Sequence, residues 1–536
     1  MPSVQEGTLG VAKPNFLVIH TDQHRADCLG IEGKRRVFTP NLDYLAVRGA
    51  RFSAAYSTCP VCIPQRLTFL TGQLASTHGV QGNIGIPYFP MEHSLPKELR
   101  GGGYQTALVG RTFHTVPSDD PNGFEYYVPG DPSSELKDTK DHFFAFLRNN
   151  APALAGGYYG NGTGNNSLVA APFHMPNEFH HTQWTTEEAL RFLNVRDTGR
   201  PFFLSVGYYA PHGPLNPPAE FFNRYYNNGD VDEPAIGEWD IPPVANWNPD
   251  RTGYVNLDGE LLKSVQAGYY GNITFADYQI GRILAKVARM PNTYIIFTSD
   301  HGENLGDHYL YHKSRPYEGS AHIPFLIAGP GISPLQVRDE PVGWHDILPT
   351  VLDLAGLPCP EGVDGESIVS LLETGDELDR ENGDELEREK PNWREYLHSE
   401  NSLRGAHAGM YPALPGQQVE GNLMYEPSWH SLTDGKWKYI WFDSSGAEQL
   451  FNLVEDPDEI IDLSTREDYS ENLISWRRLL AKTLQGRPEG FTSNGEDLVA
   501  GRPHEQLSED AEQLMQTRIS QGFDIAYKHY NKPRRP

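Results

Sequence analysis

Short apolar runs alternate along the first two thirds of the chain with segments that have the spacing of helices. The four clearest runs cover residues 15–20, 104–110, 202–207 and 293–299. Continuous apolar runs of this length are typical of strands that are buried on both faces of a parallel sheet. We therefore predict an α/β fold with a large, mostly parallel central sheet and helices on both of its faces.

Three of the intervening segments have the features of helices. The capping box TTEE at residues 185–188 predicts the start of an amphipathic helix. Residues 265–290 predict a long helix that leads into the fourth apolar run, and residues 346–357 predict another. The alternation of strands and helices fades after that point.

Polar side chains follow each of the four apolar runs. They are Asp22 and Gln23 after the first run, Arg111 and His114 after the second, His212 after the third, and Asp300 and His301 after the fourth. Open α/β sheets bind ligands beyond the carboxyl ends of their strands. A single Asp or His at a strand end is often only a turn residue, so it is the convergence of four ends that predicts a site.

The last third of the chain has a different pattern. Residues 365–390 are strongly acidic and contain two similar segments, GDELDR and GDELER, which we interpret as a solvated insertion. Residues 437–442 and 448–453 predict a hairpin, and residues 473–484 predict a helix. These features predict a catalytic α/β domain over residues 1–390 and a smaller α+β domain over residues 391–536.

Composition narrows the classes of partner. The chain has 536 residues and a formal net charge of −27, which disfavours nucleic acid and anionic membrane surfaces as partners. An anionic substrate must then be attracted by a local cluster of cationic groups. Four cysteines in a chain of this length do not make a disulfide framework.

The sequence contains no apolar segment that is long enough to span a membrane. Residues 1–14 lack the basic start and the apolar core of a signal peptide. We expect a soluble protein that is either cytoplasmic or exported after removal of a signal peptide, and the sequence leaves the compartment open.

The segment CIPQR at residues 62–66, which continues into an apolar helical turn, is the most specific motif. Pro64 suits the first turn of a helix because its missing N–H would have no partner there, so Cys62 lies at a helix N-terminus. The helix dipole favours negative charge at that point, and Arg66 adds a cation one turn later. The alternative is that Cys59 and Cys62 form a C-x-x-C redox or zinc motif, although the other two cysteines are isolated in the sequence.

The motif closely resembles the signature of type I sulfatases, and the resemblance extends over nearly the whole chain. Residues 14–23 resemble the first strand of that family with its acidic metal-binding end, and residues 298–308 with Lys313 resemble its second metal segment. Residues 434–440 and 450–457 resemble two strands of its C-terminal domain. The resemblance implies an alkaline-phosphatase-like α/β/α sandwich and a sulfuric ester hydrolase.

In this family the cysteine is oxidised to formylglycine, whose hydrated gem-diol is the nucleophile. The resemblance therefore implies that a formylglycine-generating enzyme modifies Cys62 during maturation. It also implies a divalent metal that is held by Asp22, Gln23, Asp300, His301 and the modified Cys62. Hard oxygen ligands favour Ca2+. His301 stands where many members have asparagine, and its nitrogen leaves Mn2+ or another divalent ion as an alternative.

The resemblance also assigns catalytic roles. The gem-diol attacks sulfur, and loss of a proton from its second hydroxyl then expels sulfate and restores the aldehyde. His114 handles that second proton, while Arg66 and Arg111 steady the formylglycine; Arg111 departs from the usual lysine. His212 and Lys313 hold the sulfate and assist the leaving alcohol.

The substrate is the least determined feature. The segment GRTFH at residues 110–114 resembles sulfatases that act on sulfated sugars, so we expect a sulfated carbohydrate. Two other interpretations stay open. One is a phosphonate monoester or phosphodiester hydrolase that uses the same aldehyde and metal, and the other is a non-catalytic ligand-binding relative in which Cys62 remains a thiol.

Overall fold

The first predicted strand lies in the middle of a large sheet in the computed structural model. The structure describes residues 13–83, 91–114, 121–132, 141–155, 157–243, 253–372, 392–402, 423, 426 and 428–501. Within these residues, β1 (Asn15–Asp22) pairs in parallel with β5 (Phe202–Pro211) on one side and with β6 (Thr293–Ser299) on the other. Since β3 (Gln105–Gly110) also pairs in parallel with β5, all four predicted strand ends meet at one edge of the sheet.

The sheet has eight strands in the order β4-β3-β5-β1-β6-β7-β2-β8. The remaining strands are β2 (Ala50–Phe52), β3 (Gln105–Gly110), β4 (Tyr126–Pro129), β7 (Phe325–Ala328) and β8 (Gln336–Arg338). Only β7 runs against its neighbours in this sheet, because its pairs with β6 and β2 are antiparallel and every other pair is parallel. The prediction of a large, mostly parallel sheet is confirmed.

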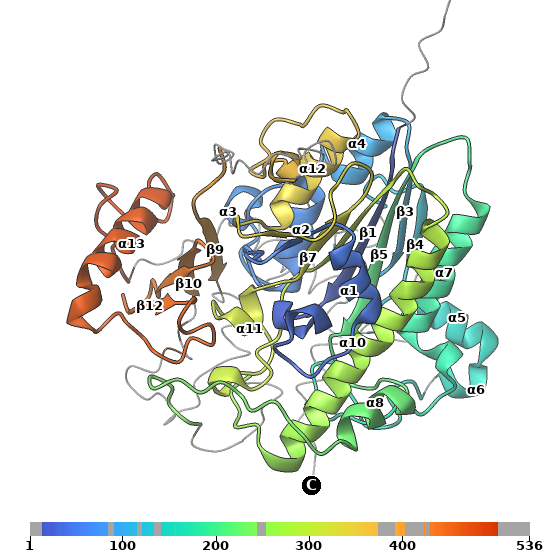
Figure 1. Ribbon diagram of the computed structural model, residues 1–536, viewed down its shortest axis with the longest axis horizontal. Helices are drawn as coiled ribbons and strands as arrows, with labels where there is room; N and C mark the ends of the chain where they lie inside the picture. Colours follow the sequence, from blue (N-terminus) through green and yellow to red (C-terminus); the bar gives the residue numbers. More distant parts are fainter. Residues whose placement is uncertain are drawn as a thin grey trace, which may run out of the picture.

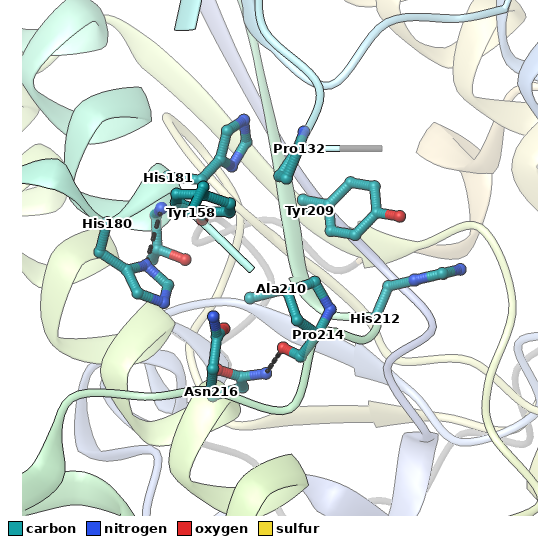
Figure 2. Close-up of a pocket in the computed structure, with 11 residues that line it drawn as sticks. Pro132, Tyr158, His180, His181, Tyr209, Ala210, His212, Pro214 and Asn216 are labelled. Atoms are coloured by element: carbon teal, nitrogen blue, oxygen red, sulfur yellow. Dashed lines mark hydrogen bonds between the residues drawn. The ribbon is translucent and has the colours of Figure 1, made fainter. Parts of the chain in front are cut away.

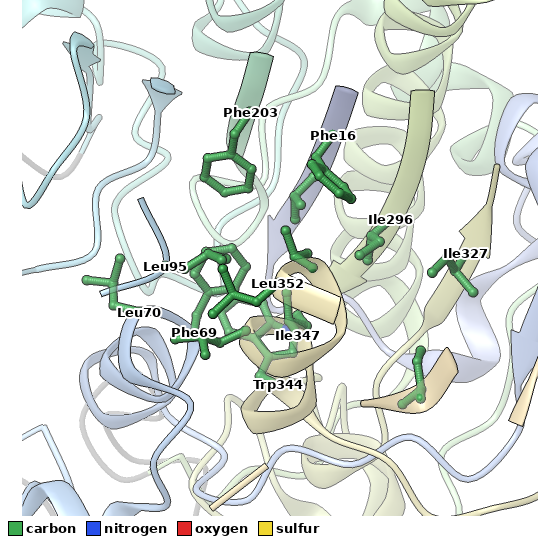
Figure 3. Packing of buried hydrophobic residues seen from close by; sticks show 14 of the residues in the cluster. Phe16, Phe69, Leu70, Leu95, Phe203, Ile296, Ile327, Trp344, Ile347 and Leu352 are labelled. Atoms are coloured by element: carbon green, nitrogen blue, oxygen red, sulfur yellow. The ribbon is translucent and has the colours of Figure 1, made fainter. Parts of the chain in front are cut away.

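Alternate residues of β1 are buried on opposite faces of the sheet, as the period of a strand requires. Phe16 and Val18 pack in one core with side chains of α2 (Cys62–Thr71), α4 (Leu95–Gly101) and α12 (Ile347–Leu354). Figure 3 shows Phe16, Phe203 and Ile296 on neighbouring strands of this core, with Trp344 and Leu352 close by.

Leu17 and Ile19 of the same strand pack in the other core, against α1 (Pro40–Val47), α7 (His181–Val195) and α10 (Gly259–Val287). In Figure 1, α7 and α10 lie along one side of the sheet and α2, α4 and α12 lie on the other. The fold is thus the α/β/α sandwich that the sequence predicts. Shorter helices are α3 (Ala75–His78), α5 (His142–Asn150), α6 (Pro152–Ala155), α8 (Ala219–Tyr226) and α11 (Glu318–Ala321).

A second sheet follows in the last part of the described chain. Its four strands are antiparallel and have the order β12-β11-β10-β9, with bounds β9 (Leu397–Ser402), β10 (Ser428–Thr433), β11 (Trp437–Trp441) and β12 (Glu448–Asn452). Helix α13 (Ser470–Thr483) packs on it (Figure 1) through Trp476 and Leu480. The predicted hairpin and helix are both present, so the smaller α+β unit is confirmed.

The domain boundary at residue 390 stays a prediction. Most of the acidic insertion, residues 373–390, lies outside the described residues. Residues 368–371, which belong to the described beginning of the predicted insertion, form a short 3₁₀ helix.

One predicted helix start is wrong. The capping box at residues 185–188 lies inside α7, which begins four residues earlier at His181. The imidazole of His180 supplies the cap, because its Nδ1 accepts a hydrogen bond of 3.1 Å from the Thr182 N–H. The hydroxyl of Thr186 donates instead to the Thr182 carbonyl within the helix. A histidine cap is less common than Ser, Thr, Asp or Asn, so the sequence pattern favoured the wrong residue.

No helix in the described part of the chain combines the length and the apolar character that crossing a membrane requires.

A buried ion cluster joins the small sheet to helix α11. Lys438 of β11 lies 2.6 Å from Glu318 of α11 and 2.8 Å from Glu459. The side chains of Lys438 and Glu459 are both 1% exposed. Although burial acts to lower it, Glu318 and Glu459 hold the pKa of Lys438 above its ordinary value.

We expect the substitution Lys438→Met to lower the apparent free energy of unfolding by about 3 kcal/mol or more, because it leaves the buried carboxylate of Glu459 without its cation and removes one partner of the half-buried Glu318. Urea unfolding followed by fluorescence measures this loss. Lys436→Met is the matched control, since its side chain is 56% exposed and its ion pair with Asp339 spans 3.2 Å. That control should change stability by less than about 0.5 kcal/mol. Equal losses in the two variants would contradict the assignment.

Buried histidines make the fold sensitive to acid. Burial lowers the pKa of His78 and His345 to about 4 and that of His180 to about 3, from an ordinary value of 6.5. Below pH 6.5 the unfolded chain therefore binds protons that the folded chain does not bind. Stability that is present above pH 6.5 is lost as the pH falls towards 4, by about 1.4 kcal/mol for each pKa unit of each group. We expect proton uptake on unfolding at about pH 6, and proton release there would contradict this account.

Candidate active site

Four chemically active side chains converge at the carboxyl edge of the large sheet. Asp22 ends β1, Asp300 and His301 follow β6 directly, and Cys62 is the first residue of α2. One ligand atom from each of the four lies within 4.8 Å of the others, and all four residues are buried. Because β1 and β6 are adjacent and parallel, their ends place the two carboxylates side by side.

The distances within this cluster are short. The Cys62 Sγ lies 3.2 Å from the His301 Nε2 and 3.8 Å from the Asp22 Oδ1. The His301 Nε2 is also 3.6 Å from Asp22 and 3.7 Å from Asp300. The other ring nitrogen of His301 donates to the Gly302 carbonyl at 2.9 Å, which directs Nε2 toward the cluster.

Arg66 balances the two carboxylates. Its Nη2 lies 2.9 Å from Asp22 and 2.8 Å from Asp300, and its side chain has no exposed surface. A second nitrogen, Nη1, donates to the Thr112 carbonyl at 3.0 Å. Burial opposes the charge on Asp22, but the surrounding His212, Arg111 and Arg66 hold the pKa of this carboxyl well below its usual range.

Helix α2 explains why Cys62 and Arg66 face the same cluster. The two residues are four apart, so they lie on one side of the helix one turn apart. The N–H of Ile63 in the first turn donates to the Asn83 Oδ1 at 2.9 Å. Cys62 is thus fixed at a helix N-terminus, as the position of Pro64 predicts.

The donor set fits a divalent cation. Two carboxylates, one imidazole nitrogen and the side chain at position 62 are buried together. Carboxylate oxygens suit Ca2+ and Mn2+, whereas the imidazole nitrogen favours a transition-metal ion over Ca2+. Although burial acts to lower it, Asp300 and Cys62 raise the pKa of His301 to about 9. A cation bound by His301 must therefore displace a proton from Nε2.

Gln23 lies beside this cluster, and its amide is fixed at both ends. Its Oε1 accepts a hydrogen bond of 2.7 Å from Lys313 Nζ, and its Nε2 donates to the buried carboxylate of Glu303. The structure thus places the predicted ligand Gln23 next to the predicted catalytic Lys313.

Arg111 and His114 are also close enough to Asp22 to interact with its charge. The Arg111 Nε lies 3.1 Å from the Asp22 Oδ2, its Nη1 contacts Asp131, and its guanidinium stacks 4.4 Å from the ring of Tyr209. Burial, with Arg111 and Arg66 nearby, lowers the pKa of His114 to about 3. His114 is therefore neutral at neutral pH and has a nitrogen that can accept a proton.

His212 and Lys313 form a hydrogen-bonded pair. The Lys313 ammonium donates to the His212 Nε2 at 2.7 Å, and the His212 Nδ1 donates to the Gly213 carbonyl at 2.8 Å. Burial and the charge of Lys313 hold the pKa of His212 well below its ordinary value, so Lys313 carries the positive charge of the pair.

Figure 2 shows a small cavity near His212 that Tyr158, His180, His181 and Asn216 also line. Its volume is only about 10 Å³, which is room for about one water molecule. This cavity is too small for a substrate, so an ester must reach His212 from another side.

Three functional-site neighbours were not predicted from the sequence: Glu303, Asp131 and Tyr209. Glu303 lies in the second metal-like segment and could have been noticed as an acidic residue two positions after His301. Asp131 and Tyr209 have no motif around them, because only the sheet brings them to Arg111.

Comparison with known proteins identifies the family. A family model described as Sulfatase matches residues 14–357. An arylsulfatase of Clostridium perfringens is 34% identical over 514 residues, which cover 92% of this chain and 98% of that protein. The chain belongs to the type I sulfatases of the alkaline phosphatase superfamily.

Two further relatives bear on substrate. An ulvan-active sulfatase of Formosa agariphila is 29% identical to this sulfatase over a match that covers 69% of this chain and 67% of that protein. The crystal structure of a phosphonate monoester hydrolase of Agrobacterium radiobacter superimposes with a TM-score of 0.68 at 25% identity, covering 87% of this chain and 95% of that one. The alkaline-phosphatase-like fold is confirmed, and this sulfatase is an enzyme that hydrolyses sulfate esters.

We expect Ca2+ or Mn2+ to raise the melting temperature of this sulfatase, because a cation that binds only the folded chain stabilises it by mass action. Asp300→Asn should abolish most of the rise, since it removes one of the two clustered carboxylate charges. Thermal unfolding across a range of cation concentrations measures the effect. Asp339→Asn, at a side chain that is 69% exposed, is the matched control and should respond like the wild type. A rise that is equal in Asp300→Asn and the wild type would show that the cation binds elsewhere.

Proposed function

We propose that this sulfatase releases inorganic sulfate from a sulfated carbohydrate, with formylglycine at position 62 as the nucleophile and Ca2+ as the cation. Mn2+ is the alternative cation because His301 contributes a nitrogen. The observation that supports this proposal best is the position of Cys62, which starts α2 and whose Sγ lies among Asp22, Asp300 and His301. The sulfur marks the place of the oxygens of the hydrated aldehyde after maturation by a formylglycine-generating enzyme.

The cation would be held by Asp22, Gln23, Asp300 and His301 together with the modified side chain. It supplies positive charge that binds the sulfate oxygens and lowers the pKa of a hydroxyl beside it. Arg66 lies against both carboxylates, so it limits the negative charge that surrounds an incoming sulfate anion.

The first chemical step transfers the sulfuryl group to the side chain at position 62. A hydroxyl oxygen of the hydrated formylglycine would bond to sulfur and give up its proton to a carboxylate of the cluster, while the bond from sulfur to the ester oxygen breaks. The leaving alcohol needs a proton, and the pair of Lys313 and His212 is the proposed donor, because the Lys313 Nζ lies 2.7 Å from the His212 Nε2 and donates a hydrogen bond to it.

The second step regenerates the aldehyde. A base takes the proton of the remaining hydroxyl, the C=O bond forms, and the bond from carbon to the sulfate oxygen breaks, so inorganic sulfate leaves. His114 is the proposed base. It is neutral in this environment, because burial and then the charges of Arg111 and Arg66 lower its pKa to about 3, and a bound sulfate anion would offset the effect of those two charges.

Support for a carbohydrate comes from two sources. The segment at residues 110–114 resembles sulfatases that act on sugar sulfates, and a relative at 29% identity is an ulvan-active sulfatase. The second candidate is a phosphonate monoester hydrolase, which the similarity to the Agrobacterium radiobacter enzyme favours. Turnover of the sulfate and phosphonate esters of one phenol separates the two, and a panel of defined sulfated oligosaccharides then identifies the sugar.

We expect Cys62→Ala to lower kcat/KM for sulfate release by about 10⁴-fold or more, because it removes the nucleophile. The matched control is Cys59→Ala, since Cys59 is a second buried cysteine whose sulfur contacts Asn401 rather than the clustered carboxylates. That variant should keep most of its activity.

The intact mass of the peptide that contains residue 62 provides an independent check after co-expression with a maturation enzyme. The expected species is an aldehyde, which also reacts with a carbonyl reagent. A thiol that persists at position 62, together with no release of sulfate, would favour a ligand-binding relative over an enzyme.

A further inference from the structure

Glu303 is a buried carboxylate with no assigned role in the chemistry. It lies two residues after His301 and is 1% exposed. Its Oε1 accepts hydrogen bonds from the backbone N–H groups of Leu305, at 3.0 Å, and His312. Its Oε2 accepts from the amide nitrogen of Gln23. Both oxygens of the carboxylate are therefore engaged as acceptors.

These contacts fix which way the Gln23 amide points. An amide side chain has a donor end and an acceptor end, whereas an ionised carboxylate only accepts and an ammonium only donates. Glu303 therefore selects the Nε2 end of Gln23, and the Oε1 end faces Lys313 at 2.7 Å. A flipped amide would place its oxygen against a carboxylate and its NH2 group against an ammonium.

The orientation continues to the catalytic pair. Lys313 donates to the Gln23 Oε1 and to the His212 Nε2, both at 2.7 Å. The chain of hydrogen bonds thus runs from Lys313 through Gln23 to Glu303 with every donor and acceptor matched. Gln23 follows Asp22 in the chain, and its backbone N–H donates to the Asp300 Oδ1 at 3.1 Å, so the residue lies beside the cluster. The proposed function assigns the same amide oxygen to the cation.

We propose that Glu303 is a positioning residue that locks the Gln23 amide with its oxygen toward the cation site and Lys313. It thereby holds Lys313 against His212. This role rests on the proposed function, since it concerns the same cation and the same leaving-group proton. It is a role of a second layer of residues around the site, which orients a ligand without touching the cation.

The carboxylate cannot be replaced by its isosteric amide without reversing this orientation. In Glu303→Gln, the backbone N–H groups of Leu305 and His312 still require an acceptor, so the new amide turns its oxygen to them. Its NH2 group then faces Gln23. Gln23 must rotate its oxygen toward residue 303, which presents its own NH2 group to Lys313 and to the cation site.

A swapped pair restores the original pattern and so gives the sharpest test. Gln23→Glu alone sets two carboxylates against each other. In the double variant Gln23→Glu/Glu303→Gln, the amide at 303 donates to one oxygen of the carboxylate at 23, and the other oxygen faces Lys313. The pair then has the original arrangement of donors and acceptors and the original net charge.

The experiment compares the wild type, both single variants and the double variant in two measurements. Without added metal, both single variants should melt at lower temperature, and the double variant should recover most of the loss. With Ca2+ or Mn2+ titrated by calorimetry, Glu303→Gln should bind at least about 10-fold more weakly and the double variant should regain that affinity. Glu459→Gln is the matched control, as an equally buried glutamate that contacts Lys438 instead of Gln23. The melting temperature of this control should fall while its cation affinity stays unchanged. Adding Gln23→Glu to it should not restore the melting temperature.

Additive losses in the double variant, or cation affinity that Glu303→Gln leaves unchanged, would overturn the positioning role. The measurement without metal keeps this result separate from the proposed function. If the wild type bound neither cation, the proposed function would fail, while recovery in the metal-free double variant would still show that Glu303 orients Gln23.

Discussion

Two buried carboxylates held side by side are the constraint on which the site depends. Asp22 and Asp300 stand at the ends of neighbouring parallel strands, and neither side chain is exposed to solvent. Two such charges cannot remain ionised at short range without nearby positive groups. Arg66 forms ion pairs with both carboxylates, and Arg111 forms one with Asp22. The fold therefore also requires these cationic side chains.

This arrangement explains how a strongly acidic chain can act on an anionic ester. The formal net charge of −27 repels anions at long range, so attraction has to be local. Arg66, Arg111 and Lys313 all lie within hydrogen-bonding distance of a residue at the carboxyl edge of the sheet. A buried position with a low dielectric strengthens the interactions of each of these charges at the candidate site.

The small sheet also contributes to the surroundings of Cys62. The Glu400 N–H of β9 donates to the Thr58 carbonyl, and the Ser399 hydroxyl donates to the Ser57 carbonyl. Asn401 of the same strand contacts the sulfur of Cys59. The segment that leads to Cys62 is therefore packed against β9 of the small sheet, which links the position of Cys62 to both parts of the fold.

The local sequence was sufficient to predict the buried strands of the large sheet and the helix start at residues 62–66. The continuous apolar runs determined the buried strands, because only strands covered on both faces are apolar at every position. Pro64 and the spacing of four residues determined that Cys62 and Arg66 lie one turn apart at a helix start. The same kind of reasoning predicted the wrong start for α7, because His180 caps this helix instead of the threonines at residues 185 and 186.

Contacts between distant segments were decided only by the tertiary structure. The sequence gives no sign that Asp131 meets Arg111, that Lys438 is buried between Glu318 and Glu459, or that Glu303 sets the direction of the Gln23 amide. Gln23 and Glu303 are 280 positions apart in the chain and become neighbours only because β1 and β6 pair in the sheet. The sequence therefore determined which reactive side chains the protein has. The pairing of strands decided which of these side chains contact one another, because hydrogen bonds and ion pairs act only over a few ångströms.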